Sequence, residues 1–472
     1  MKIRRICALT AAVMTAFSAV SCGSSGGGDE LESYVDQVDV EETQEISAIP
    51  DGAEKELDWL SYFDLNPAKG SKEKSTELTL FEQKGGSIKY SPCTSMTNFD
   101  ALATRLLAND PPDMFWFEGS MCFPNYCMKD MFQPIDSIVD FDSAMWSDVK
   151  GTADRFVLNG EHYVAPVKYV ANSILTYDKD VIEANGFDDP YELYLDGSWD
   201  WDSWYDMMSE YVKNAPADEE RYGVNGWIEP FMFYSTGHTL IEYDDEKKEY
   251  VSNIDDPNFE RATTLLYNIQ KNGLHQSEWI GQASDCFRQN ILFYAMGPWA
   301  SSDIHTPKDG SSWGSVPLPK DPNADAQYTS VEINAYMWIE GSKKADAMKT
   351  WYECCKTAYF DPEYLEISKE KFFVKNPNWT EDMYHVAYEE LSGSNWVQLV
   401  DPGYGLTNEL SNDKGASNDF KQAVITYMYT SVMKSDEDGS QYTWTQLREK
   451  YKGTIDSELK SFNEEYKKYI GA

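Results

Sequence analysis

The sequence lacks the local signatures by which many enzymes are recognised. No P-loop or GxGxxG pattern is present. Histidine is scarce, and the five residues show neither HExxH nor another metal-ligand spacing. They are His162, His238, His275, His305 and His385. We therefore predict no catalytic residue, metal ligand or cofactor. Paired carboxylates must still occur by chance among 80 Asp and Glu, so a glycoside hydrolase stays open as an alternative.

Positive charge is also scarce. The 472 residues hold 40 Lys and Arg against 80 Asp and Glu, for a formal net charge of -40. A chain with a large negative net charge is repelled by nucleic acid and by anionic lipid headgroups, so we expect neither as a partner.

Long apolar runs are absent except at the N-terminus. Lys2, Arg4 and Arg5 form a basic region, and Ile6 to Val20 is a 15-residue apolar stretch, which is short for a membrane span. A small-residue cleavage site then precedes Cys22, as in the lipobox of bacterial lipoproteins. We predict a signal peptide over residues 1–21, lipidation of Cys22, and a place on the outer face of the cell membrane. Plain secretion is the alternative.

A flexible acidic tether is predicted over residues 22–50. Residues 23–28 are almost all Gly and Ser, and residues 29–45 carry eight acidic side chains and no basic one. Loss of the leader removes three positive charges, so the mature chain carries -43 (-40 minus 3).

Cysteine usage leaves one question open. The spacing of the cysteines fits no zinc pattern, and Cys122 and Cys127 form either a disulfide or two free thiols.

The first part of the folded chain predicts an α/β sheet. Strand-like stretches at 57–63, 87–92 and 113–118 alternate with helix-like stretches at 75–86 and 98–110. This β-α-β-α-β order implies a parallel sheet covered by helices. Further on, one stripe of a helix is formed by Trp201, Trp204, Tyr205, Met208 and Val212, which predicts core positions for the tryptophans.

Several blocks, in order, resemble a known family. They are PPDMFWFEG, YVAPVKYVANSILTYDKDVIEANGFDDP, SWDWDSWYDMM, GWIEPFMFY, NILFYAMGPWA, WGSVPLPKDPNA and NAYMWIEGSKKADAMKTWYECC. Together they span most of residues 57–355 and resemble the extracellular solute-binding proteins of bacterial ABC sugar importers, in the maltodextrin-binding branch. The C-terminal third is similar only in helical character.

The resemblance implies a two-lobe periplasmic-binding-protein-like fold of type II, with a ligand cleft between lobes joined by hinge crossings. Lobe one is expected over 50–168 and 300–352, and lobe two over 174–295 and 356–472. It also implies a monomer that delivers its ligand to two permease subunits in the membrane, and these in turn are partnered by a cytoplasmic ATPase. No cofactor is implied.

A sugar site needs flat aromatic side chains for the C–H faces and carboxylates or amides for the hydroxyls. We select such residues at strand ends, at crossings and in one Gly- and Pro-containing stretch. The predicted ligand-binding residues are Phe63, Asp64, Phe117, Glu118, Trp227, Glu229, Phe231, Tyr234, Trp299, Glu332, Asn334, Trp396 and Tyr404.

The sequence therefore predicts a lipid-anchored extracellular protein that captures a carbohydrate, with an oligosaccharide as the expected form, and carries out no reaction. A secreted glycoside hydrolase or lyase, a binder of a peptide or polyamine, and an adhesive or sensory surface protein remain alternatives. For Trp299, packing as a wedge between the lobes is the alternative to ligand contact.

Overall fold

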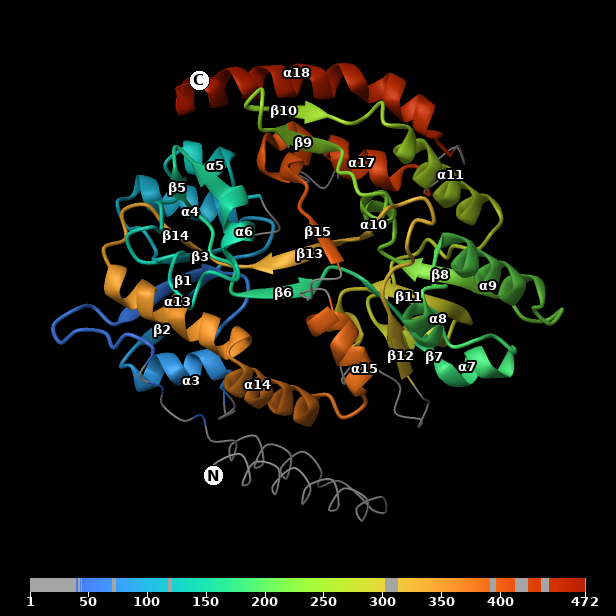
Figure 1. The fold of residues 1–472 in the computed structure, drawn as a ribbon, viewed down its shortest axis with the longest axis horizontal. Helices are drawn as coiled ribbons and strands as arrows, with labels where there is room; N and C mark the ends of the chain where they lie inside the picture. The colour runs from blue at the N-terminus through green and yellow to red at the C-terminus, as the bar shows by residue number, and fades with distance from the viewer. Residues whose placement is uncertain are drawn as a thin grey trace, which may run out of the picture.

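Two separate four-stranded sheets form the centres of two lobes in the computed structural model of the protein (Figure 1). The structure describes residues 40, 43, 45–69, 74–117, 121–301, 313–390, 396–411, 423–433 and 441–471. The predicted signal peptide and Cys22 lie outside these residues. Within them, no helix is both long and apolar enough to cross a membrane.

The first sheet has the order β14-β3-β1-β2. Its strands are β1 (Glu56–Ser61), β2 (Ser87–Pro92), β3 (Met114–Trp116) and β14 (Tyr336–Trp338). Strand β1 pairs in parallel with both β2 and β3, which confirms the predicted parallel order. Strand β14 joins antiparallel to β3 from much later in the chain.

The second sheet has the order β12-β7-β11-β8. Its strands are β7 (Ile174–Asp178), β8 (Tyr222–Gly226), β11 (Ile291–Met296) and β12 (Trp313–Val316). All six residues of β11 are buried, because the sheet is covered on both faces.

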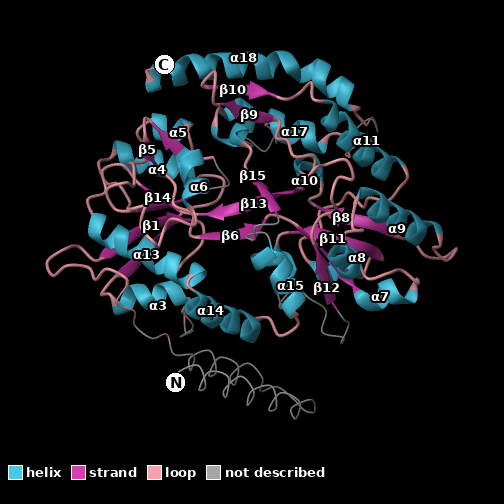
Figure 2. Cartoon of the chain, viewed as in Figure 1, coloured by secondary structure: helices cyan, strands magenta, loops and turns pink. Residues whose placement is uncertain are grey.

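Helices lie along the outside of both sheets (Figure 2). Those associated with the first sheet are α3 (Thr76–Gln83), α4 (Asn98–Leu107), α5 (Asn125–Met128), α6 (Lys150–Ala153), α13 (Ala345–Phe360) and α14 (Pro362–Lys375). The others are α7 (Lys179–Ala184), α8 (Pro190–Asp196), α9 (Trp201–Lys213), α10 (Glu229–Tyr234), α11 (Pro257–Lys271), α12 (Ala283–Phe287), α15 (Glu381–Tyr384), α16 (Asn408–Ser411), α17 (Val424–Thr430) and α18 (Trp444–Ile470). In α9 the side chains of Trp201, Trp204 and Met208 are buried, as predicted.

Three strands connect the lobes. They are β6 (Lys168–Ala171), β13 (Gln327–Asn334) and β15 (Trp396–Leu399), and they form a sheet of their own in the order β15-β13-β6. In Figure 1, β6 and β13 run between the two lobes. Two short hairpins complete the strands: β4 (Val157–Leu158) with β5 (Glu161–His162), and β9 (Ile241–Asp244) with β10 (Glu249–Ser252).

The predicted division of the chain between the lobes differs from the structure in two places. Strand β12 pairs with β7 in the second sheet, and Trp199 Nε1 donates to Pro317 O at 2.8 Å, so residues 313–317 lie with lobe two. Helix α14 packs against α3 and α13, so residues 362–375 lie with lobe one. The crossing back to lobe one is therefore β13 and not the segment near residue 300.

The tether prediction also needs a correction at its C-terminal end. Ile46 and Ile49 are buried, and Ser47 N donates to Glu353 Oε2 at 2.6 Å. Ile46, Ser47 and Ile49 therefore pack on lobe one, while Glu45, Ala48 and Pro50 between and beside them are exposed. The cysteine question is also answered: Cys122 and Cys127 are buried and form no disulfide with each other, and Cys127 Sγ donates to Cys122 O at 3.5 Å.

Candidate functional site

Three tryptophans from lobe two form an exposed aromatic surface, which we call the tryptophan platform. Trp227, Trp279 and Trp299 are 44%, 63% and 53% exposed. The ring centroid of Trp227 lies 5.7 Å from that of Trp279 and 6.4 Å from that of Trp299. Contiguous exposed indoles are costly in water, so such a patch marks a surface that binds something.

The platform is held at the C-terminal ends of two neighbouring strands. Trp227 follows β8, and its N–H donates to Ala295 O of β11 at 2.7 Å. Trp299 lies in the single turn η2 (Pro298–Ser301), just after β11. In open α/β sheets, ligands bind beyond the C-terminal ends of strands.

Two glycines make this arrangement possible. A Cβ on Gly297 would lie 2.5 Å from Trp299 Nε1, so only glycine lets the indole fold back over the backbone. Gly226 has φ +106°, and a Cβ there would lie 2.0 Å from Ala295 O. Trp299 therefore rests on its own turn, and with half its surface exposed it is not a wedge between the lobes.

The crossing strand β6 ends close to the platform's support. Ser173 Oγ, just after β6, donates to Trp227 O at 3.1 Å, and Asn172 Nδ2 donates to Ser330 Oγ of β13 at 2.8 Å. Glu229, the first residue of α10, is buried next to Trp227, and its Oε2 accepts from Ile228 N at 3.3 Å. The platform thus sits where the hinge enters lobe two.

The sheet formed by the crossing strands has one polar face and one apolar face. Strands β6 and β13 pair antiparallel, with Asn334 opposite Lys168 and Glu332 opposite Val170. Side chains alternate along a strand, and opposite residues share a face. The polar face carries Lys168, Asn172, Ser330, Glu332 and Asn334. Its Asn334 Oδ1 is buried and has no hydrogen-bond partner among the described residues.

Aromatic residues of lobe one meet the polar face. Trp116 hydrogen-bonds the carboxylate of Glu332, and its ring centroid lies 5.5 Å from that of Phe63. Burial raises the pKa of Glu332, while attraction to Lys168 and the Trp116 hydrogen bond oppose that rise. Strand β6 has four residues, so the two ends of this face lie roughly 10 Å apart. Phe63, Glu332 and Asn334 are thus brought together at its lobe-one end.

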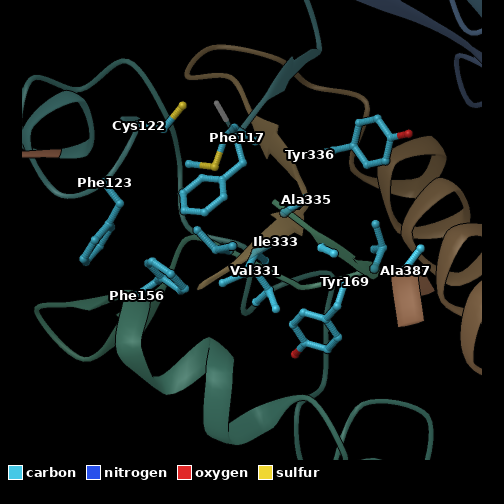
Figure 3. Close-up of a cluster of buried hydrophobic side chains, with 14 of the residues drawn as sticks. Phe117, Cys122, Phe123, Phe156, Tyr169, Val331, Ile333, Ala335, Tyr336 and Ala387 are labelled. Carbon is cyan, nitrogen blue, oxygen red and sulfur yellow. The ribbon is translucent and has the colours of Figure 1, made fainter. Parts of the chain in front are cut away.

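The apolar face of the crossing sheet is a core, and it contains one predicted site residue. Phe117 is buried, and its ring centroid lies 5.1 Å from that of Phe156. Figure 3 shows Phe117 among Phe156, Val331 and Ile333. Phe117 follows Trp116 in the strand, and neighbouring residues point to opposite sides, so its side chain packs in the core while Trp116 meets the polar face.

The other predicted residues lie away from the platform. Trp396 is buried, and its Nε1 donates to Tyr194 OH at 3.1 Å. Tyr234 is buried and hydrogen-bonded to Tyr404. Phe231, half-buried, has its ring centroid 6.2 Å from that of Tyr234.

Asp64 is exposed at the end of β1 and accepts from Asn66 N at 2.9 Å. Glu118 lies outside the described residues. The platform therefore contains two of the predicted residues, Trp227 and Trp299, and not the whole predicted set.

Sequence reasoning missed Trp279, Trp116 and Lys168. Trp279 lies in the segment between α11 and α12, where no strand end marks it. Lys168 carried a usable signal, because it is the single charged residue within the apolar stretch YVAPVKYVA. A lysine in a buried strand must find a partner, and this points to a polar site.

A comparison with protein families matches residues 79–355, more than half of the 472 residues, to the bacterial extracellular solute-binding proteins. The chain belongs to this family. The description names binding and no reaction, which supports the prediction of a binding protein, and it places the family outside the cell. No curated protein sequence matches the chain.

Solved structures of similar architecture confirm the two-lobe periplasmic-binding-protein fold. One is the galacto-N-biose/lacto-N-biose I-binding protein of a Bifidobacterium longum ABC transporter, with TM-score 0.62, 13% identity, and coverage of 88% of this chain and 99% of that one. Another is the sugar-binding protein MalE of Xanthomonas citri, with TM-score 0.56, 16% identity, and coverage of 88% and 98%. A third is the Listeria monocytogenes substrate-binding protein Lmo0181 in complex with cycloalternan, with TM-score 0.55, 15% identity, and coverage of 88% and 99%.

Proposed function

We propose that this solute-binding protein captures a carbohydrate outside the cell and delivers it to the permease of an ABC importer. The observation that carries the proposal is the tryptophan platform beside the polar face of the crossing strands. Indole faces suit the C–H faces of sugar rings, and the carboxylate and amide of Glu332 and Asn334 suit hydroxyl groups. The three similar proteins of known structure named above are each described as a sugar binder or as bound to a saccharide, and this supports a carbohydrate ligand.

Binding at the hinge provides a mechanism without bond-making. A ligand that contacts both the platform and the polar face stabilises the closed arrangement of the lobes, and closure presents both lobes to the permease. A monomer is sufficient for this.

Calorimetry of the purified protein against a panel of mono- and oligosaccharides tests the proposal. We expect at least one saccharide to bind with 1:1 stoichiometry and without product formation. The double variant Trp227→Ala/Trp299→Ala should lose most of this affinity, whereas Leu195→Ala, which removes a 61% exposed side chain from the same lobe, should retain it. Absence of binding across the panel would refute the proposal, and turnover of a labelled oligosaccharide would favour the glycoside hydrolase alternative.

The lipid anchor is a separate part of the proposal and rests on the sequence before Cys22. Cell fractionation after metabolic labelling with a fatty acid tests it. The wild-type protein should be labelled and stay with the membrane, and Cys22→Ser should be unlabelled. An unlabelled wild-type protein in the medium would indicate plain secretion.

A further inference from the structure

A cavity of about 400 Å³ lies at the lobe-one end of β6. Its wall includes four lysines, Lys74, Lys168, Lys371 and Lys375, and we call it the lysine cavity. Against them stand two carboxylates, Asp64 and Glu77. The whole chain has twice as many acidic as basic residues, so the local balance is the reverse of the global one. An anion repelled by a protein of charge -40 needs such a local site to bind.

Lys168 is the cation at the centre of this wall. Its Nζ lies 4.5 Å from the ring centroid of Tyr359 and 4.9 Å from that of Tyr388. It forms no ion pair with a carboxylate in the part of the chain that the structure describes. Burial lowers the pKa of Lys168, and the carboxylates of Glu77 and Glu332 oppose this at longer range. Tyrosine rings orient an ammonium group without neutralising it, so its charge remains for a ligand.

The other lysines support this assignment. Lys74 is already paired with Glu82, and Lys371 Nζ donates to Lys74 O at 3.1 Å. They contribute positive potential around the cavity, while Lys168 provides the donor for a ligand.

Glu77 adds an acceptor that lacks a partner. Its side chain is buried, with 6% exposed, and its Oε1 accepts from Tyr359 OH at 3.0 Å. Its Oε2 is buried and has no hydrogen-bond partner among the described residues. A buried carboxylate oxygen without a donor is costly, and a hydroxyl group of a ligand would satisfy it.

We propose that the lysine cavity binds the acidic residue of a carboxylated carbohydrate, a uronic acid. Its carboxylate meets Lys168, one of its hydroxyls donates to Glu77 Oε2, and its ring lies against the tyrosines of the wall. This rests on the proposed function, in that the ligand is a carbohydrate, and it specifies the class. The volume falls within the range of small-ligand pockets, about 300–1,000 Å³.

Matched pairs of uronic acid disaccharides and their methyl esters, in galacto, gluco and manno configurations, test the proposal by calorimetry. The ester keeps the shape and removes the charge. We expect at least one acid to bind tenfold or more tightly than its ester, and only the acid's affinity to fall with added salt. Lys168→Met should reduce binding of the acid at least tenfold and leave the ester within twofold. Glu77→Gln should weaken both, since it acts on a hydroxyl.

The matched control is Lys450→Met, because Lys450 also lies over tyrosine rings, 5.0 Å from the centroid of Tyr427, but on α18. It should bind both members of the pair as the wild type does. Melting temperatures check that each variant is folded, and the salt dependence of the wild type needs no variant.

The outcomes separate the two proposals. Binding of neutral sugars with no acid preferred over its ester would overturn the acidic class and leave carbohydrate capture standing. Equal loss of acid and ester in Lys168→Met would assign Lys168 a purely structural role and overturn the inference. Binding of no saccharide at all would overturn the proposed function itself.

Discussion

Substitution of Gly297 by alanine tests the platform without removing any tryptophan. The added Cβ would lie 2.5 Å from Nε1 and 2.7 Å from Cδ1 of Trp299, closer than side chains approach, so the indole must leave its place. Gly297 does not have a positive φ, so the backbone accepts alanine without strain. The perturbation therefore acts on the position of one ring.

The expected loss of affinity follows from the exposed area of that ring. A tryptophan side chain presents up to about 250 Å². Because Trp299 is 53% exposed, roughly 130 Å² is available to a ligand by this measure. If a sugar covers half of it, about 65 Å² at 25 cal/mol/Å² gives about 1.6 kcal/mol, or roughly 15-fold in affinity. Stability should change by less than about 1 kcal/mol, since Gly→Ala also restricts the unfolded chain.

Calorimetry with the best saccharide and urea denaturation of the free protein measure the two effects. The control is Gly453→Ala in α18, where nothing lies within 4 Å of the added Cβ. Affinity within threefold of the wild type would refute the role of Trp299 in binding. A large loss of stability with unchanged affinity would restore the wedge interpretation.

Three further predictions concern stability. Burial lowers the pKa of Lys356 to about 8, so Lys356→Met should raise the free energy of unfolding at pH 7 by about 3 kcal/mol in urea. The stability of the wild type should also rise between pH 8 and 10.5, because in this range the lysine is protonated in the unfolded chain and neutral in the folded one. A Lys356→Met variant less stable than the wild type would contradict the cost of burying this charge, on which both expectations depend. Burial raises the pKa of Asp401 to about 7, so stability should fall by about 4 kcal/mol as pH rises from 4 to 7. The Asp401→Asn variant should not show this fall of stability between pH 4 and 7. If the variant and the wild type depend on pH in the same way, the burial of the Asp401 carboxyl is contradicted. Gly226→Ala should cost about 3 kcal/mol in urea, because its Cβ would lie 2.0 Å from Ala295 O at a positive φ; a neutral effect would contradict the close strand contact.

Local sequence patterns were sufficient to predict much of the fold. Periodicity placed the tryptophans of α9 in the core, where the structure has them. The parallel pairing of β1 with β2 and β3 also follows from the alternation of strands and helices. These features depend on neighbours in sequence.

Features that depend on distant segments were predicted less well. Trp396 is followed by a Gly- and Pro-containing stretch, which indicated a loop, yet it belongs to β15 and pairs with Gln327. The lobe-two place of β12 depends on its pairing with β7, more than a hundred residues earlier. Trp279 joins Trp227 only through folding of the loop that carries it. The positions of Trp227 and Trp299 at strand ends predicted them as site residues, but Trp279 has no such position in the sequence.

The order of the strands along the chain has a consequence for biosynthesis. Lobe one begins the chain, with β1, β2 and β3 complete by Trp116, but its edge strand β14 is made only at Tyr336–Trp338. The sheet of lobe two closes earlier, when β12 ends at Val316. The sheet that starts first is therefore completed last, and β3 keeps an unpaired edge while the sheet of lobe two is being made. The first sheet of a nascent chain therefore stays incomplete until about three quarters of the chain has been synthesised, and until then its open edge exposes unpaired backbone groups.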